Sequence, residues 1–341
     1  MATIKDVAQL SGVSIATVSR VINKSGYIDK ETEKRVLSAI QELNYTPNHL
    51  ARSLIKRRTQ TLGLILPDIT NPFFPLLARA IEDIAQQNKY SVMYCNSDND
   101  ILKLSKSFKL LKDRSVDGMI IAGDLSQDHI EVLSQFDIPI AVIDSNVGDA
   151  PVHQVFTDNV LGARIAVNHL LEQGYRRIAH IRGEWRASTA RNRHQGYMEA
   201  LQEWDIPYDP ILVQPGDYQI QSGYEAMLRL LALASPPDAV FAANDLMALG
   251  AIHAILEHQL RIPEDIGVVG FDDLPLTKVL RPSLTTVRQS IYDMGVISTK
   301  LQLESIENPP KEKEDYKVVV LDPVLQVRET SLRKKEQDNI E

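Results

Sequence analysis

From residue 61 onward, the chain alternates short apolar runs with longer amphipathic stretches. Apolar runs of four to six residues indicate strands buried on both faces, which is typical of parallel sheets. The predicted strands are 62–66, 91–94, 118–121 and 139–143, followed by 177–181, 239–242 and 266–270. The predicted helices are 72–87, 103–113, 163–173, 191–203, 222–233 and 247–256. Two such series predict an α/β fold with two doubly wound lobes.

The first 45 residues show a different pattern. Thr3, Ser14 and Asp29 each precede apolar residues at helical spacing, and each can cap the N-terminus of a helix. Gly12 can end the first helix in the left-handed conformation. Two short helices, a glycine-containing turn between them and a longer third helix predict a helix-turn-helix unit.

Charge is divided unevenly along the chain. Residues 1–60 carry a net charge of +5 and the remainder carries −13. A basic module on an acidic body favours a nucleic-acid partner. We therefore expect the second helix to enter the major groove, where Arg20 could donate two hydrogen bonds to a guanine. The predicted DNA contacts here are Thr3, Ser14, Ile15, Ala16, Thr17, Ser19, Arg20, Asn23, Lys24 and Tyr27.

The segment that follows predicts a short helix. Thr46 is a candidate N-cap, and Pro47 suits a first helical turn. A helix of two or three turns is unstable alone in water, so we expect it to fold against a partner helix on DNA. Leu54 could then wedge between base pairs in the minor groove. The alternative is a plain linker with one apolar residue.

These patterns predict four regions along the chain. They are a DNA-binding headpiece over 1–46, a hinge helix and linker over 47–60, a two-lobed core over 61–330, and a disordered tail over 331–341.

Polar and aromatic residues follow the ends of the predicted strands. Ligands of doubly wound sheets bind beyond the carboxyl ends of the strands. Asp, Asn, Arg and Gln side chains can hydrogen-bond sugar hydroxyls, and aromatic rings can pack on sugar C–H groups. The predicted ligand site consists of Asn71, Phe73, Phe74, Asp144, Arg193, Tyr218, Asn244, Asp272 and Gln289. Taken singly, the rings could be core residues and the Asp and Asn residues could be helix caps.

Ala2-Thr-Ile-Lys-Asp-Val-Ala8, the run from Gly12 to Asn23, and Ala51-Arg-Ser-Leu54 resemble the headpiece and hinge of the lactose-repressor/galactose-repressor family. The core is similar to periplasmic sugar-binding proteins, notably at 70–74, 190–193, 241–245 and 270–272. The resemblance implies a homodimeric repressor on a palindromic operator, with Leu54 inserted and a monosaccharide as effector.

Residues 63–83 resemble ribose repressors of Gram-positive bacteria, so ribose is the first expectation. Ribose-binding proteins usually have Arg where this chain has Ser145, which leaves pentose and hexose open. We expect the sugar to close the lobes and thereby separate the hinge helices. The opposite sign, with the sugar as co-repressor, also occurs in the family.

Other classes of function lack support in the sequence. No nucleophile elbow, phosphate loop or metal-ligand motif is present, so we expect no enzyme, cofactor or metal site. No apolar run reaches the roughly 20 residues of a membrane span, and residues 1–20 lack a signal-peptide core, so we expect a cytoplasmic protein.

A second possible input is a seryl-phosphorylated phosphocarrier protein, which related catabolite regulators bind. Tyr292 and Asp293 resemble part of that contact surface. Lys300 and Gln302 lie where those regulators show an Arg-Leu pair, which is a departure from their pattern.

Overall fold

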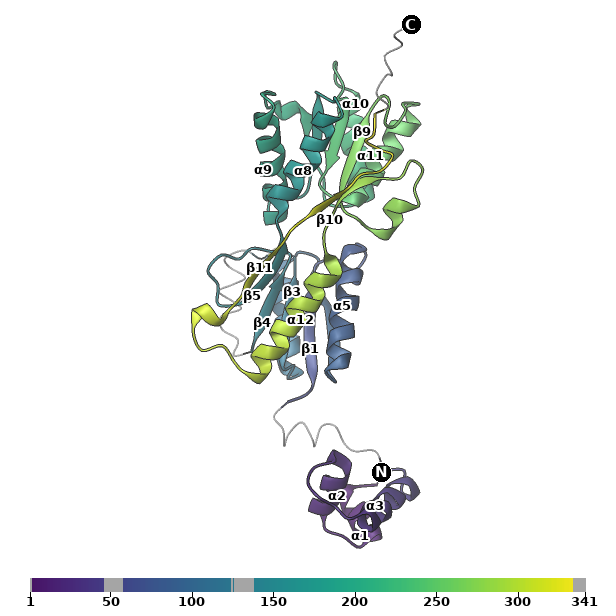
Figure 1. Cartoon of the computed structure of the whole chain (residues 1–341), viewed down its shortest axis with the longest axis vertical. Helices are drawn as coiled ribbons and strands as arrows, with labels where there is room; N and C mark the ends of the chain where they lie inside the picture. Colours follow the sequence, from purple (N-terminus) through teal and green to yellow (C-terminus); the bar gives the residue numbers. More distant parts are fainter. Residues whose placement is uncertain (1, 46–57, 124, 126–137, 334–341) are drawn as a thin grey trace. The chain divides into compact units, whose positions relative to one another are not determined.

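The computed structural model describes residues 2–45, 58–123, 125 and 138–333 (Figure 1). The chain divides into two compact units, Met1–Thr59 and Gln60–Glu341, and each is described by itself.

The first unit consists of α1 (Ile4–Ser11), α2 (Ile15–Asn23) and α3 (Lys30–Glu42). The N-caps predicted for these three helices are confirmed: Thr3, Ser14 and Asp29 each accept a hydrogen bond from the backbone N–H three residues later, whereas Thr46 lies outside the described residues. Gly12 ends α1 with φ of 67°, as predicted. Side chains from all three helices form one small core, with Val7, Val18 and Val36 at its centre.

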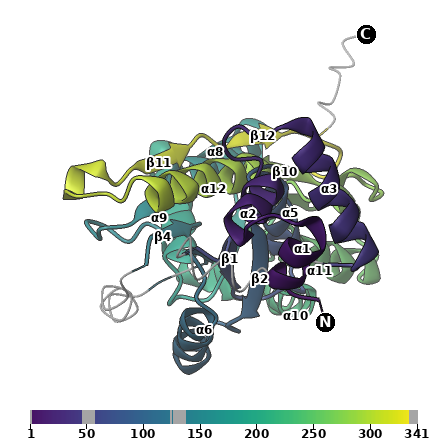
Figure 2. The ribbon, with the colours of Figure 1, turned by 90° about the horizontal axis from the view of Figure 1, so that it is seen from below.

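The first lobe of the second unit is a sheet in the order β11-β5-β4-β3-β1-β2, with every strand pair parallel. Its strands are β1 (Thr61–Leu66), β2 (Ser91–Asn96), β3 (Gly118–Ala122), β4 (Ile140–Ile143), β5 (His153–Thr157) and β11 (Val318–Leu321). Helices α5 (Phe73–Gln87) and α12 (Ile291–Glu307) cover one face, and α6 (Ile101–Asp113) covers the other (Figure 2).

The second lobe is a sheet in the order β12-β10-β9-β8-β6-β7. Its strands are β6 (Ile178–Arg182), β7 (Val213–Pro215), β8 (Ala239–Ala242), β9 (Gly267–Asp272), β10 (Thr285–Arg288) and β12 (Val324–Gln326), and β12 alone runs antiparallel to its neighbour. Helices α8 (Asn159–Glu172) and α9 (Ser188–Glu203) pack on one face, with α10 (Ile220–Leu231) and α11 (Asp245–Glu257) on the other. Short 3₁₀ turns lie at Pro210–Leu212, Pro275–Lys278 and Lys313–Asp315.

The chain crosses between the lobes three times. It passes from β5 into α8, returns from β10 into α12, and crosses again between β11 and β12 (Figure 1). Each lobe is therefore built from separate segments of the chain, and the first and third crossovers lie side by side, where the Asp158 N–H donates to the Leu321 carbonyl at 3.1 Å.

The predicted two-lobed α/β architecture is confirmed, with some differences in its elements. Strand β2 lies at the edge of its sheet and is half exposed, so the prediction of a buried strand is wrong there. The predicted tail boundary is wrong for Ser331, which is fully buried with its hydroxyl bonded to His169 and Thr285. Residues 334–341 of the predicted tail lie outside the described residues. Among the helices that the structure describes, none has both the length and the apolar character that crossing a bilayer requires.

Candidate functional site

A cavity of about 480 Å³ lies between the two lobes. All nine residues that the sequence predicts for a ligand site line it: Asn71, Phe73, Phe74 and Asp144 from the first lobe, and Arg193, Tyr218, Asn244, Asp272 and Gln289 from the second. The carboxyl ends of β1, β4, β8, β9 and β10 bring most of them together, as the doubly wound topology requires.

Arg193 is a buried cation on the second-lobe side of the cavity, with 3% of its surface exposed. Its Nε donates to Asn159 Oδ1 at 2.7 Å, and its Nη1 donates to the Ala243 carbonyl. The same Nη1 lies 3.9 Å from Asp272 Oδ1, which is an ion pair but too long for a hydrogen bond. Arg193 lies in the second turn of α9 rather than at the start of the helix, because the helix begins at Ser188 and not at 191 as predicted.

Asp272 ends β9 with φ of 118°, a conformation that side-chain-bearing residues rarely adopt. Its Oδ1 accepts a hydrogen bond from Gln289 Nε2 at 2.7 Å. Burial raises the pKa of Asp272 to about 6, although Arg193 and the Gln289 hydrogen bond both act to lower it. Gln289 Oε1 is buried and has no hydrogen-bond partner among the described residues, so one acceptor at the cavity wall remains available.

Asp245 is a second buried carboxylate close to this group, although it does not line the cavity. Its oxygens accept hydrogen bonds from the Thr286 hydroxyl and from the Leu274 N–H. Burial raises its pKa well above the ordinary value, and the negative charge of Asp272 adds to the effect. Because both carboxylates are buried and repel each other when ionised, the pair favours keeping one proton.

Tyr218 and Asn244 are joined by one hydrogen bond. Asn244 Oδ1 caps α11 by accepting from the Met247 N–H at 3.0 Å, and its Nδ2 donates to the Tyr218 carbonyl at 3.0 Å. The Tyr218 hydroxyl lies 3.1 Å from Thr189 Oγ1. Asn244 is therefore both a helix cap and a residue of the cavity wall.

The first lobe contributes two aromatic rings to the cavity wall, beside polar residues. Phe73 and Phe74 meet edge to face, with ring centres 5.1 Å apart, and both also belong to the core of the lobe. Asn71 Oδ1 accepts from the Phe73 N–H at 3.1 Å, which fixes the start of α5. Asp144 directly follows β4 with φ of 61°.

Sequence reasoning missed a hydrogen bond that spans the two lobes. Gln219 Nε2 donates to Asp68 Oδ2 at 2.8 Å, and both residues line the cavity. Asp68 also accepts from the backbone and the hydroxyl of Thr70. Both residues lie one to three positions from predicted ligand residues, and that proximity is the signal that could have identified them.

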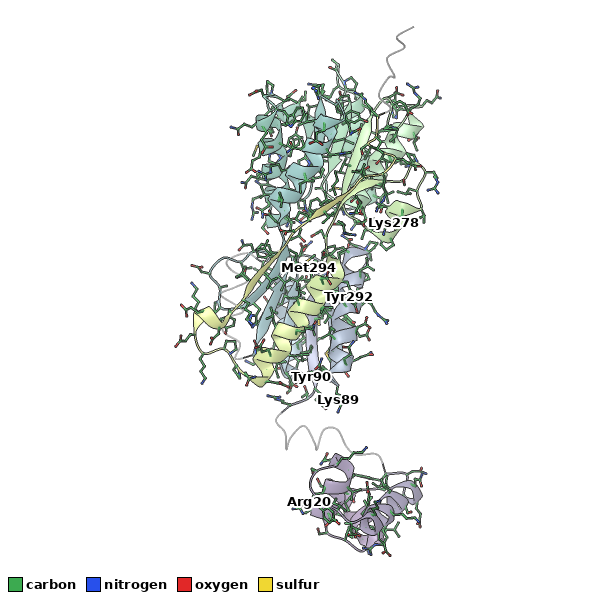
Figure 3. The ribbon with its side chains drawn as sticks, viewed as in Figure 1. Arg20, Lys89, Tyr90, Lys278, Tyr292 and Met294 are labelled. Carbon is green, nitrogen blue, oxygen red and sulfur yellow. The ribbon has the colours of Figure 1, made fainter. Side chains whose placement is uncertain are left out.

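The predicted DNA contacts form the accessible side of the first unit. Ile15, Ala16, Arg20 and Asn23 are exposed on α2, and Thr17 and Ser19 are partly exposed. Thr3, Ser14, Lys24 and Tyr27 lie exposed beside the ends of the helices. Within residues 2–45, the Arg20 guanidinium makes no hydrogen bond or ion pair, and its side chain projects from α2 (Figure 3). It is therefore available to a partner.

Two further predictions have a more limited outcome. Leu54 and most of the predicted hinge helix lie outside the described residues. Over the described ranges, no group of three or more His, Cys, Asp or Glu side chains is arranged to hold a metal ion.

Segments of both units match models of known protein families. Residues 3–48 match the family model of bacterial regulatory proteins of the lacI family, and residues 167–331 match the periplasmic binding protein-like domain. The ribose operon repressor of Halalkalibacterium halodurans is 42% identical over 97% of both chains.

Two solved structures are also similar. The lac repressor dimer bound to operator and the anti-inducer ONPF superposes with a TM-score of 0.89 at 30% identity, covering 97% of this chain and 99% of the other. A LacI family regulator from Enterococcus faecium with bound ribose has a TM-score of 0.72 at 33% identity, covering 81% of this chain and 100% of the other.

Proposed function

We propose, from the premise that this chain belongs to the lacI family of bacterial regulatory proteins, that it is a transcriptional repressor released from its operator by a monosaccharide such as ribose. Its relatives are repressors, and the chain is a regulator rather than an enzyme. The sugar, the operator and the homodimer are the parts that we propose.

The gap between Arg193 and Asp272 carries the proposal for a sugar. A sugar hydroxyl is both an acceptor and a donor. Placed in this gap, one hydroxyl could accept from the guanidinium and donate to the carboxylate, replacing a 3.9 Å ion pair with two charge-assisted hydrogen bonds. Gln289 Oε1, which lacks a partner, could accept from a neighbouring hydroxyl.

The aromatic residues support the same class of ligand. Phe73 and Phe74 line the cavity together with polar and charged side chains, which suits a molecule with an apolar C–H face and hydroxyl edges. The similarity to a ribose operon repressor and to a LacI family regulator with bound ribose supports ribose as the first sugar to test. Ser145, which is buried, remains the departure from ribose-binding proteins that keeps other monosaccharides in the comparison.

For the DNA-binding unit, we infer that two copies read a palindromic operator as a homodimer in the cytoplasm. The accessible face of α2 and the net positive charge of residues 1–60 support major-groove binding. Two headpieces related by a twofold axis match two half-sites. Insertion of Leu54 between base pairs remains a prediction of the family resemblance.

We further propose that the sugar acts through the junction of the lobes. A ligand held by residues of both lobes favours one arrangement of the lobes over others, by as much as its affinity differs between them. Changing operator affinity tenfold to a thousandfold needs only about 1.4–4 kcal/mol of such coupling.

The test combines two measurements on the full-length protein. Thermal shift against D-ribose, other pentoses, hexoses and their phosphates identifies the ligand, because a true ligand stabilises by mass action. Operator binding is followed by fluorescence anisotropy, using a palindromic duplex selected from random sequences. We expect saturating D-ribose to weaken binding to the selected duplex. Equal binding to selected and random duplexes, with every sugar present or absent, would refute the proposed function.

One observation bears on the phosphocarrier input. Tyr292, labelled in Figure 3, is exposed at the start of α12, and so is Asp293, so part of a contact surface is accessible there. Gln302 is fully buried, however, and its Nε2 donates to the Pro139 carbonyl at 2.7 Å. This arrangement disfavours the second input. Co-purification of the seryl-phosphorylated carrier with the intact repressor, in the absence of sugar, would restore it.

A further inference from the structure

We propose that Asn159, which does not line the cavity, is a positioning residue that links the ligand site to the crossovers between the lobes. Asn159 is the first residue of α8, directly after the chain leaves β5 and enters the second lobe. It is 4% exposed. The inference rests on the proposed function, because it concerns how the same cavity controls the arrangement of the lobes.

Both ends of the Asn159 amide are in use. Its Nδ2 donates to the Thr157 carbonyl at 2.9 Å, within the first crossover. Its Oδ1 accepts from Arg193 Nε at 2.7 Å. Asn159 therefore joins the arginine of the cavity to the backbone of the crossover, and the two bonds together fix the orientation of the amide.

The polar chain continues across the cavity to the second crossover. Arg193 faces Asp272, and Asp272 accepts from Gln289 Nε2 at 2.7 Å. Gln289 lies in the short segment between β10 and α12, where its carbonyl accepts from the Ile291 N–H at 2.9 Å. This set of side chains therefore connects the first crossover with the second. Its longest separation is the 3.9 Å between Arg193 Nη1 and Asp272 Oδ1.

The separation between Arg193 and Asp272 lies where a ligand could bind and connect the two residues. A hydroxyl bound between Arg193 and Asp272 would complete this series of hydrogen-bonded side chains and hold the two crossovers at a fixed spacing. Asparagine suits the position because it offers a donor and an acceptor on a short side chain, whereas alanine offers neither and aspartate offers only the acceptor. Loss of Asn159 should alter the response of the lobes without removing a contact to the ligand.

The first experiment is amide hydrogen exchange of the full-length protein without ligand. The variant is Asn159→Ala. The matched control is Asn168→Ala, which lies in the same helix, α8, and removes a 2.9 Å side-chain hydrogen bond to Glu203 of α9. We expect Asn159→Ala to speed exchange about tenfold or more in 157–162 and also in 289–294, because the variant loses the charge-assisted hydrogen bond from Arg193. We expect Asn168→Ala to leave both segments unchanged. Equal exchange in 289–294 for the two variants would overturn the inference.

A second variant separates the two bonds and guards against failure of the alanine variant to fold. Asn159→Asp keeps the oxygen that accepts from Arg193 and removes the donor to Thr157. We expect faster exchange in 157–162 only, with 289–294 as in the wild type. A general loss of stability would instead speed both segments together in both Asn159 variants, and that result would also overturn the inference.

The final measurement adds D-ribose to the wild type and the variants. We expect the wild type to gain protection in 157–162 and 289–294, and Asn159→Ala to lose at least half of that gain in 289–294 at saturating sugar. If the wild type binds no sugar, the proposed function fails, while the ligand-free exchange still decides the role of Asn159. If sugar protects both segments equally in the wild type and in Asn159→Ala, the positioning role is wrong.

Discussion

The guanidinium carbon of Arg193 lies 3.8 Å from the centre of the Phe271 ring. The ring itself is tightly held, because a Cβ at Gly162 of α8 would come within 2.8 Å of two of its atoms. A planar cation on a fixed aromatic face, with hydrogen bonds at its edge, has little freedom to rotate. The cavity therefore presents Arg193 to a ligand in one orientation.

That orientation predicts a loss of sugar binding in Arg193→Lys. Lysine keeps the charge but cannot bond Asn159 and the Ala243 carbonyl while also facing Asp272. We expect D-ribose affinity to fall about tenfold to a hundredfold, as measured by isothermal titration calorimetry. Operator affinity without sugar should stay within about threefold. Arg191→Lys on the same helix, whose guanidinium donates to exposed carbonyls of the preceding loop, is the control and should bind sugar as the wild type does.

Arg20→Ala should weaken operator binding and relax its sequence preference. Arg20 is exposed on α2, and a bidentate contact to guanine contributes roughly 1–3 kcal/mol of discrimination. We expect affinity for the selected duplex to fall about fivefold to 150-fold, with a much smaller change for random duplex. Arg35→Ala on α3, which loses only a bond to Thr32, serves as the control. An equal loss on both duplexes would assign Arg20 to phosphate contact instead.

Sugar affinity should decrease on acidification. The pKa of Asp272 is raised by burial to about 6, so its carboxylate gains a proton as the pH falls through that value. A protonated Asp272 is a poorer acceptor for a hydroxyl and a weaker partner for Arg193. We expect D-ribose affinity to be roughly tenfold lower at pH 5 than at pH 7.5. In Asp272→Asn the affinity should be low and independent of pH over the same range. A flat profile in the wild type would contradict the role given to the carboxylate.

Stability should also depend on pH, through buried histidines. Burial lowers the pKa of His153, His169 and His194, and it lowers that of His180 to about 3. The folded protein keeps these rings neutral, whereas the unfolded chain takes up protons below its ordinary pKa of about 6.5. Unfolding therefore binds protons, and the free energy of unfolding falls as the pH drops below about 6.5.

His180→Phe measures the share of one ring in that dependence. The variant keeps the stack on Phe241 and removes one titrating group, so its stability should fall less steeply between pH 6.5 and 5, by about 1.1 kcal/mol per pH unit on average. Denaturant unfolding at several pH values gives the slope. Tyr197→Phe, which loses a buried bond to the Ile178 carbonyl in the same cluster, should keep the wild-type slope. Identical slopes in all three proteins would argue against a neutral buried His180.

The elements that sequence patterns missed share a physical cause. Strand β5 begins with His153 and Gln154, which read as polar although both are buried. Their side chains are satisfied by Ser305 and Val147, and the first of these lies 152 residues away. Helix α12 was missed because Ser298 and Thr299 lie on its buried side, where they donate to carbonyls of the preceding turn. Local periodicity cannot reveal polar groups whose partners come from packing.

The same limit applies to the cavity. Asn71, Asp144, Asn244 and Asp272 could be found because they lie at or just after the ends of strands that the apolar pattern predicts. Asn159 follows β5, the strand that lacked such a pattern, and it acts behind Arg193 rather than in the wall. Asp68 and Gln219 meet only because the two lobes face each other, at a separation of 151 residues. Residues at strand ends follow from topology, whereas contacts between the lobes and residues behind the wall depend on side-chain geometry.

The threefold passage of the chain between the lobes has a consequence for biosynthesis. The headpiece core is complete within the first 45 residues, so it can form while the ribosome is still reading the rest of the message. The first lobe cannot, because α12 and β11 are its last parts to leave the ribosome. Until α12 has emerged as far as Glu307, the apolar side of α5 that packs on it has no cover. A premature stop late in the message would therefore damage the lobe nearest the start of the core, and such fragments should be substrates for chaperones and proteases.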